Sequence, residues 1–188
     1  MGKIVLASAS PRRRQILKNL GLEIEVKPSP YEEKHTTTVF SYNFVENLAY
    51  NKAKAVADLF KNEDKIIVGA DTVVVLDGEI LGKPKDKNNA ISMLKSLSGK
   101  AHDVVTSVAV INSKTGKTLI KSDTSTVEFE KLTDEQIEFY VNEFKPLDKA
   151  GAYGIQEMPK GYIKSCEGEI DTVIGLNGKT VLEMINNL

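Results

Sequence analysis

Apolar runs alternate with segments of helical periodicity along the whole chain. Continuous apolar runs at Ile4–Leu6 and Ile66–Leu76 predict buried strands. Apolar positions spaced by three and four residues predict a helix that begins at Pro11 and ends at Gly21, and another over residues 43–61. This alternation of strands and helices is typical of an α/β protein.

The second half of the chain continues the pattern with long strands. Asp77-Gly78 is a hairpin signal after the second apolar run. Residues 104–111 and 118–129 are separated by a polar turn, and we expect these two strands to pair antiparallel, which makes the sheet mixed. The remaining expected elements are a helix over residues 87–97, a helix from the capping box of Thr133 and Gln136 to about Phe144, a strand near residues 169–174 and a short terminal helix.

Composition and charge fit one globular domain over residues 1–188. Of the 188 residues, 41% are hydrophobic and 27% charged, and the formal net charge is -1. This balance gives no general attraction to a nucleic-acid polymer or an anionic membrane, and no apolar stretch approaches the length of a membrane span. Cys166 is the single cysteine, which excludes an internal disulfide and a multi-cysteine metal site and fits a reducing cytosol.

The first predicted helix opens with a run of arginines. Ser10 suits its N-cap and Pro11 its first position. A helix N-terminus already carries about half a positive charge, so cations there are unfavourable unless an anion lies among them. Free backbone N–H groups and guanidinium forks match the oxygens of a phosphate. We therefore predict that Arg12 and Arg13 contact phosphates, and the alternative is a solvated arginine surface.

Asp71 interrupts the apolar strand Ile66–Leu76. An unpaired carboxylate in an apolar interior costs several kcal/mol, so a metal ion, a cationic side chain or backbone donors must offset it. Gly69 and Ala70 beside it would let a ligand approach the backbone closely. Asp71 is therefore the leading candidate for a catalytic residue, and the alternative is a buried structural aspartate.

Three further charged residues gain weight in combination with Asp71. Glu33 is either a solvated loop charge or a partner in holding Mg²⁺, which is commonly bound by one or two carboxylates plus substrate phosphates. Lys52 lies beside the apolar face of its predicted helix, where it either reaches a phosphate or extends into solvent. Lys83 lies in a rigid Gly-Lys-Pro turn, whose spacing does not match a phosphate-binding P-loop.

Five motifs follow one another along nearly the whole chain. They are Ser8-Ala9-Ser10-Pro11-Arg12-Arg13, Gly69-Ala70-Asp71-Thr72-Val73-Val74, Gly82-Lys83-Pro84, Ser98-Gly99 with His102, and Asp148-Lys149-Ala150-Gly151-Ala152-Tyr153-Gly154-Ile155-Gln156. With them the chain resembles the Maf family of nucleoside triphosphate pyrophosphatases from residue 3 to about residue 176. The resemblance implies an elongated mixed sheet flanked by helices, with a deep cleft between two lobes, in a cytoplasmic and often dimeric protein.

The resemblance also implies a reaction and residue roles. Family members hydrolyse nucleoside triphosphates to the monophosphate and pyrophosphate with a divalent metal, Mg²⁺ or Mn²⁺. Asp71 is expected to be the general base, and Gln156 indicates the branch that acts on dTTP and UTP. The expected site comprises Asp71, Lys52 and Lys83 as catalytic residues, Ser8, Arg12, Arg13, Thr72 and Gln156 as substrate-binding residues, and Asp71 with Glu33 as metal ligands.

Three other functions need to be weighed. A 7-methyl-GTP pyrophosphatase is expected to carry a glutamate at the position of Gln156. A nucleotide-sensing regulator of cell division would use the same pocket without turnover. A haloacid-dehalogenase phosphatase needs a second aspartate where this chain has Val73. The chain also departs from the family pattern at Glu32-Glu33, usually Asp-Glu, and at Thr172–Asn177, usually Asn-Val-Val-Gly-Leu-Pro.

Overall fold

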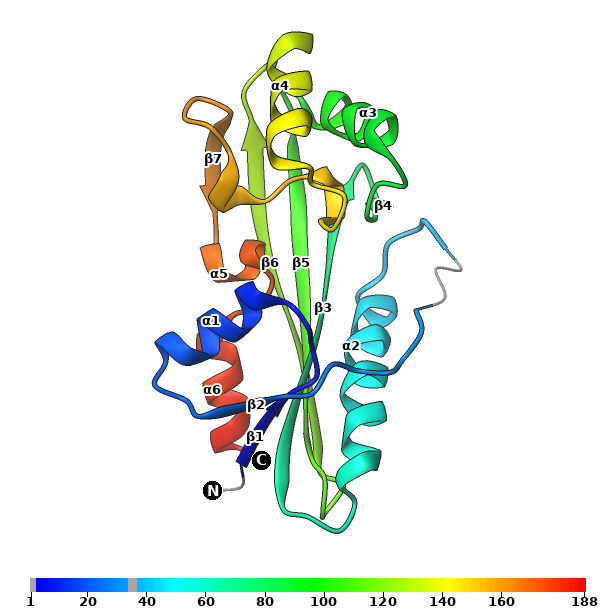
Figure 1. Cartoon of the computed structure of the whole chain (residues 1–188), viewed down its shortest axis with the longest axis vertical. Coiled ribbons are helices and arrows are strands. Elements are labelled where there is room, and N and C mark those ends of the chain that lie inside the picture. The colour runs from blue at the N-terminus through cyan, green and yellow to red at the C-terminus, as the bar shows by residue number, and fades with distance from the viewer. Residues whose placement is uncertain (1–2, 34–36) are drawn as a thin grey trace.

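One mixed β-sheet organises the protein, seen in a computed structural model that describes residues 3–33 and 37–188. Within these residues the sheet has seven strands in the order β2-β1-β3-β5-β6-β7, and β4 pairs with β3. Figure 1 shows β3, β5 and β6 running along most of an elongated molecule. The strands are β1 (Lys3–Leu6), β2 (Ile24–Val26), β3 (Lys65–Leu76), β4 (Glu79–Leu81), β5 (Ala101–Asn112), β6 (Thr118–Phe129) and β7 (Ile163–Glu167).

Parallel and antiparallel pairing meet at β3. β1 pairs parallel with both β2 and β3, whereas β4 and β5 pair antiparallel with β3, and β6 and β7 continue the antiparallel part. The mixed α/β sheet expected from the sequence is therefore confirmed. None of the described helices combines the length and apolar character needed to cross a lipid bilayer.

Helices cover the two faces of the sheet unequally. α2 (Tyr42–Ala57) packs on one face, where it contacts residues such as Ile67. On the other face, α1 (Pro11–Asn19) and α6 (Gly178–Asn186) cover one end, and α3 (Lys87–Leu97) and α4 (Asp134–Phe144) cover the other (Figure 1). Two separate apolar clusters on one face therefore leave a break near the middle of β3.

The edge of β3 that faces β1 is open at this break. β1 pairs with β3 up to Val68, and β4 pairs with it from Val74 onward. No strand in the described part of the chain pairs with that edge in between. Successive side chains of a strand point to opposite faces, so an open edge makes both faces reachable from one side. Asp71 and Thr72, on opposite faces of β3, consequently line the same cavity.

Local signals in the sequence account for the ends of several helices. Ser10 caps α1 and Pro11 is its first residue, as predicted. The capping box of Thr133 and Gln136 begins α4, also as predicted. Asn177, one of the departures from the family pattern, caps α6, because its Oδ1 accepts hydrogen bonds from the first N–H groups of that helix.

Three expectations about elements were wrong or incomplete. Residues 169–174 do not form a strand: α5 (Ile170–Ile174) is a helix, and the last strand is β7, just before it. Apolar residues at Ile170, Val173 and Ile174 have helical spacing, and a run this short does not distinguish the two structures. β2 was not predicted, and the helix expected to reach residue 61 ends at Ala57, followed by a 3₁₀ turn over Asp58–Phe60.

Candidate active site

A cavity of about 500 Å³ opens at the unpaired edge of β3. Its walls come from the loop between β1 and α1, the segment before α2, β3 itself, the turn after β4 and the loop after α4. The structure brings every predicted site residue to this cavity. They are Ser8, Arg12, Arg13, Glu33, Lys52, Asp71, Thr72, Lys83 and Gln156.

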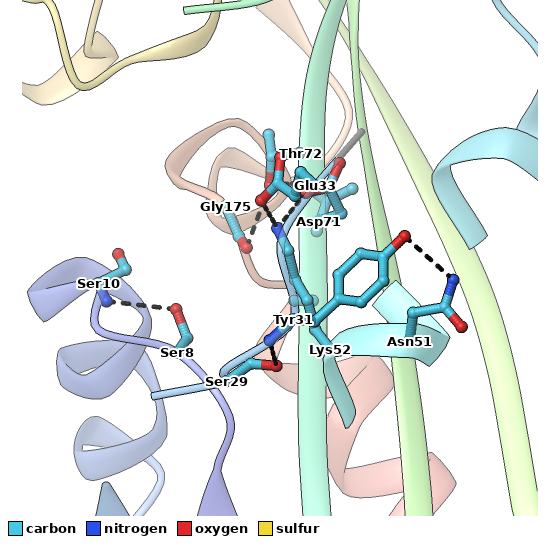
Figure 2. A network of polar contacts seen from close by, with 12 residues as sticks. Ser8, Ser10, Ser29, Tyr31, Glu33, Asn51, Lys52, Asp71, Thr72 and Gly175 are labelled. Carbon is cyan, nitrogen blue, oxygen red and sulfur yellow. Dashed lines mark hydrogen bonds and ion pairs between the residues drawn. The ribbon is translucent and has the colours of Figure 1, made fainter. Parts of the chain in front are cut away.

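Asp71 is paired with a cation from α2. Its side chain is 9% exposed, and its Oδ1 lies 2.5 Å from the Nζ of Lys52. The same Nζ lies 2.5 Å from Oε1 of Glu33, so one ammonium joins two carboxylates (Figure 2). The requirement that a buried carboxylate be paired is therefore met by a lysine, and the interpretation of Lys52 as a solvent-directed side chain was wrong.

Close packing of α2 against β3 brings Lys52 within reach of Asp71. A side-chain carbon at Gly69 would lie 2.7 Å from the backbone oxygen of Ala49 and the backbone nitrogen of Ala53, both in α2. Only glycine permits this approach. The expectation that Gly69 leaves room for a ligand was therefore wrong, because α2 fills that space.

The segment that carries Glu33 is fixed at two points. The backbone N–H of Tyr31 donates to Oγ of Ser29, and Nδ2 of Asn51 donates to the hydroxyl of Tyr31 at 3.4 Å (Figure 2). Asn51 precedes Lys52 in α2. The helix that supplies the cation therefore also anchors the segment that supplies the second carboxylate.

The donor chemistry of Asp71 and Glu33 fits a divalent cation. Both carboxylates already converge on one positive charge, the ammonium of Lys52, and carboxylate oxygens are the ligands that Mg²⁺ and Mn²⁺ prefer. In residues 3–33 and 37–188 no group of three or more histidine, cysteine, aspartate or glutamate side chains is arranged to hold a metal. A metal held by these two carboxylates would complete its coordination with water and with oxygen atoms of a substrate, as phosphates provide.

Arg13 binds the protein itself on the opposite face of β3. Its Nη1 donates to the carbonyl of Ala70 at 2.9 Å, its Nε to the carbonyl of Gly175 at 2.8 Å, and its Nη2 to Oγ1 of Thr72 at 3.0 Å. Nη1 also lies 3.3 Å from Oγ of Ser8. The Ala70 carbonyl lies on the open edge, so Arg13 takes the place of a missing strand neighbour.

These contacts change the interpretation of the arginine run. The sequence predicted an anion as the partner that offsets an arginine at a helix N-terminus, whereas carbonyl oxygens serve Arg13 in the structure. Burial lowers the pKa of the Arg13 guanidinium below its ordinary value, and the negative charge of Asp71 opposes that shift. That Arg13 contacts a phosphate stays a prediction. The structure adds a second role, in which Arg13 holds backbone carbonyls in place.

Arg12 points to a second group of charges across the cavity. Its Nη1 lies 3.6 Å from Oδ2 of Asp148, and Asp148 and Glu157 both pair with Nζ of Lys149, at 2.9 Å and 3.1 Å. Lys149 is 8% exposed and lines the cavity, although it was not among the predicted site residues. The position of Lys149 inside the last of the five motifs could have indicated a site residue. The sequence alone does not predict that the side chain is buried.

Part of the cavity lining is an apolar wall, and the lining also includes an amide. Gln156 lies in a 3₁₀ turn, Ile155–Glu157, and is exposed at the cavity. An apolar wall with one amide suits a planar heterocycle better than a phosphate. The wall consists of Val74, Ile80, Val104, Tyr153, Ile155 and Val173.

Comparison with known proteins identifies the family to which this chain belongs. The family model described as Maf-like protein matches residues 3–188, and the chain belongs to this family. It is 45% identical over 176 residues to a protein of Desulforamulus reducens named dTTP/UTP pyrophosphatase, covering 94% of this chain and 91% of the relative. Relatives of the same name in Thermotoga maritima and Acetivibrio thermocellus are 44% and 43% identical, over 92% and 94% of this chain and 83% and 90% of their own.

Proposed function

We propose that the protein hydrolyses nucleoside triphosphates, with dTTP and UTP preferred, to the monophosphate and pyrophosphate. The observation that carries this proposal is the cavity, whose lining combines a buried carboxylate–lysine group with an apolar wall and an amide. Its volume of about 500 Å³ is in the range of small-molecule sites. The names of the relatives support the same reaction.

Phosphate binding is assigned to the wall formed by α1 and the turn after β4. Arg12 and Lys83 line the cavity and supply positive charge. The first N–H groups of α1 add a partial positive charge at the same wall. Arg13 contacts Ser8, in the loop between β1 and α1, and the carbonyl of Ala70 on β3, so it links this loop to the open edge of the strand. The triphosphate would therefore lie between α1 and Lys83.

Asp71 is assigned the proton transfer. A water molecule attacks the α-phosphorus, its proton passes to a carboxylate oxygen of Asp71, and the bond from the α-phosphorus to the bridging oxygen breaks, so that pyrophosphate leaves with the electron pair. Lys52, which contacts Asp71, provides positive charge beside the reacting group. A divalent cation, held by Asp71 and Glu33, supplies charge neutralisation on the phosphate oxygens when bound.

Gln156 is assigned the reading of the base. An amide offers both a donor and an acceptor, which match the neighbouring N–H and carbonyl groups of uracil and thymine. A glutamate offers acceptors alone and suits the N–H donors of a guanine-like edge. The neutral Gln156 therefore favours dTTP and UTP over 7-methyl-GTP. A cytoplasmic location and a homodimer are further proposals that rest on the family resemblance.

A panel of nucleoside triphosphates, with pyrophosphate and orthophosphate detected separately, tests this function. We expect dTTP and UTP to be turned over with pyrophosphate as the first product, with Mg²⁺ or Mn²⁺ required. Orthophosphate as first product would indicate a phosphatase, and binding without turnover would indicate a nucleotide sensor. The Asp71→Asn variant, which we expect to have strongly reduced turnover, is assayed in parallel to exclude a contaminating hydrolase.

A further inference from the structure

The loop that ends in Gln156 has an unusual backbone. Gly151 and Ala152 are consecutive residues with positive φ, at 65° and 61°. A positive φ is ordinary for glycine but costs free energy for alanine, so surrounding contacts must hold Ala152 in this conformation. Gly151 also has no room for a side chain, because a Cβ would lie 2.8 Å from Val74 on β3. The loop is therefore held against the sheet in one strained arrangement.

Two buried aromatic hydroxyls anchor this loop just after the strained residues. The hydroxyl of Tyr153 lies 2.7 Å from Nε2 of His102, at the start of β5. The backbone N–H of Gly154 donates to the hydroxyl of Tyr140 in α4 at 3.0 Å. The two contacts hold adjacent residues from two different elements, and Gln156 follows two residues later.

The contact of His102 with Tyr153 is fixed and uncharged. His102 is 3% exposed and Tyr153 is 5% exposed, and their rings pack edge to face with each other and with Phe129. Burial lowers the pKa of His102 to about 4 and raises that of Tyr153 above its ordinary value, so both stay neutral near pH 7. A permanently neutral pair that is enclosed by aromatic rings suits positioning and not proton transfer.

Tyr153 connects this buried pair to the cavity. Tyr153 belongs to the cavity lining and to the same apolar cluster as Val74 and Val104, whereas His102, which contacts the Tyr153 hydroxyl, is not part of the described lining. A change at His102 therefore reaches a bound ligand through Tyr153 and the loop.

We propose that His102 is a positioning residue for base selection: through the Tyr153 hydroxyl it holds the Gly151–Gln156 loop so that Gln156 and the Tyr153 ring face the nucleotide base. This inference rests on the proposed function, because it requires Gln156 to read a base. It assigns a role to His102, which the reaction itself does not use. Its effect should appear in the choice between bases and in KM more than in kcat.

Three variants separate the hydrogen bond from the bulk of the side chain. Tyr153→Phe keeps the ring and removes the hydroxyl, and His102→Ala removes the ring nitrogen. His102→Gln restores an amide that can donate or accept a hydrogen bond near the position of Nε2, so this variant should rescue. Ile137→Ala is the matched control, because Ile137 belongs to the same buried cluster as Tyr153. This variant should lower stability without removing either partner of the hydrogen bond between His102 and Tyr153.

The measured quantity is the ratio of kcat/KM for dTTP to kcat/KM for CTP. We expect this ratio to fall about tenfold in Tyr153→Phe and His102→Ala, mainly through KM, because small displacements of a binding group have effects of this size or larger. His102→Gln should recover most of the wild-type ratio, and Ile137→Ala should keep it. An unchanged ratio in Tyr153→Phe, or an equal fall in Ile137→Ala, would overturn the proposal, and Tyr153→Phe decides if His102→Ala does not fold.

Gln156→Ala distinguishes failure of this inference from failure of the proposed function. If wild type prefers dTTP and Gln156→Ala abolishes that preference while the His102 and Tyr153 variants keep it, the positioning role alone is wrong. If wild type releases no pyrophosphate from dTTP or UTP, or Gln156→Ala retains the full preference, the proposed reading of the base is wrong and the inference about His102 falls with it.

Discussion

The two faces of β3 at its open edge hold their charges in different ways. On the face covered by α2, Asp71 is paired with the ammonium of Lys52, which also contacts Glu33. On the opposite face, the guanidinium of Arg13 is bonded to backbone carbonyls, those of Ala70 and Gly175, and to a hydroxyl. One face pairs charge with charge, and the other pairs charge with the backbone.

This difference indicates which residues can exchange partners. Lys52 contacts Asp71 and Glu33 through side chains that line the cavity. A metal ion could therefore take the place of the ammonium, or a phosphate the place of a carboxylate, without a movement of the backbone. The carbonyl of Ala70 belongs to β3 and that of Gly175 follows α5, so Arg13 cannot release them without loosening both elements. We therefore interpret the Asp71 face as the chemical part of the site and the Arg13 face as its scaffold.

Replacing Asp71 by asparagine should have the largest effect. Asp71→Asn keeps the shape and removes the proton acceptor, so we expect kcat to fall about 10²-fold to 10⁴-fold, the usual scale for a general base. The free energy of unfolding should change little, since the variant loses its charge together with the cost of burying it. Steady-state rates and urea unfolding of the same preparation measure both. Near wild-type turnover would return Asp71 to a structural role.

Acid should destabilise the protein through His102, because burial lowers its pKa by more than the neighbouring charge of Asp103 raises it. Its pKa of about 4 lies below the ordinary value of 6.5. Between these two pH values His102 is therefore protonated in the unfolded chain and stays neutral in the folded chain. Stability should therefore be full above pH 6.5 and fall as the pH drops, by about 3 kcal/mol in total near pH 4.

Urea unfolding of wild type and His102→Gln from pH 7 to pH 4 checks this expectation. The variant lacks the titrating imidazole, so its stability should depend less steeply on pH over this interval. Parallel curves for the two proteins would show that other groups, such as the carboxylates, account for the whole acid effect.

Removing Arg13 should cost stability as well as any phosphate contact. Arg13→Ala leaves the carbonyls of Ala70 and Gly175 without their present donor, and we expect the free energy of unfolding to fall by about 2 kcal/mol. From the sequence alone we would expect the stability of the ligand-free variant to be unchanged or slightly higher, because a cation at a helix N-terminus is unfavourable. Arg14→Ala is the matched control, since Arg14 is an exposed arginine in the same helix. Equal stability of the two variants would contradict the scaffold role.

The sequence predicted which residues gather at the cavity better than it predicted their partners. Local signals such as the Ser10 cap and the apolar run of β3 were sufficient for most elements, because capping and periodicity act over a few residues. The pairing of Asp71 with Lys52 was not predictable, since it depends on how closely α2 approaches β3. The open edge of β3 was likewise not predictable from the sequence, because it arises where pairing with β1 stops and pairing with β4 begins.

Changing Gln156 to glutamate should have the smallest effect, and it tests whether recognition is separate from both faces of β3. Gln156→Glu replaces a donor by an acceptor, so an acceptor of the pyrimidine would face another acceptor, at a cost of roughly 1–2 kcal/mol in transition-state binding. We take the lower part of the usual range because Gln156 is exposed before a nucleotide binds.

The expected result is a loss of about tenfold in the preference for dTTP and UTP over 7-methyl-GTP, with the fold and the kcat of the best substrate retained. Catalytic efficiencies for dTTP, UTP, CTP and 7-methyl-GTP in both proteins measure it, with Gln136→Glu as a control for a glutamine of the α4 capping box, outside the cavity lining. Identical substrate profiles before and after the Gln156 change would mean that the base is read elsewhere on the apolar wall. Tyr153 would then be the next residue to test, because it lines the cavity beside the loop and its ring is fixed by His102.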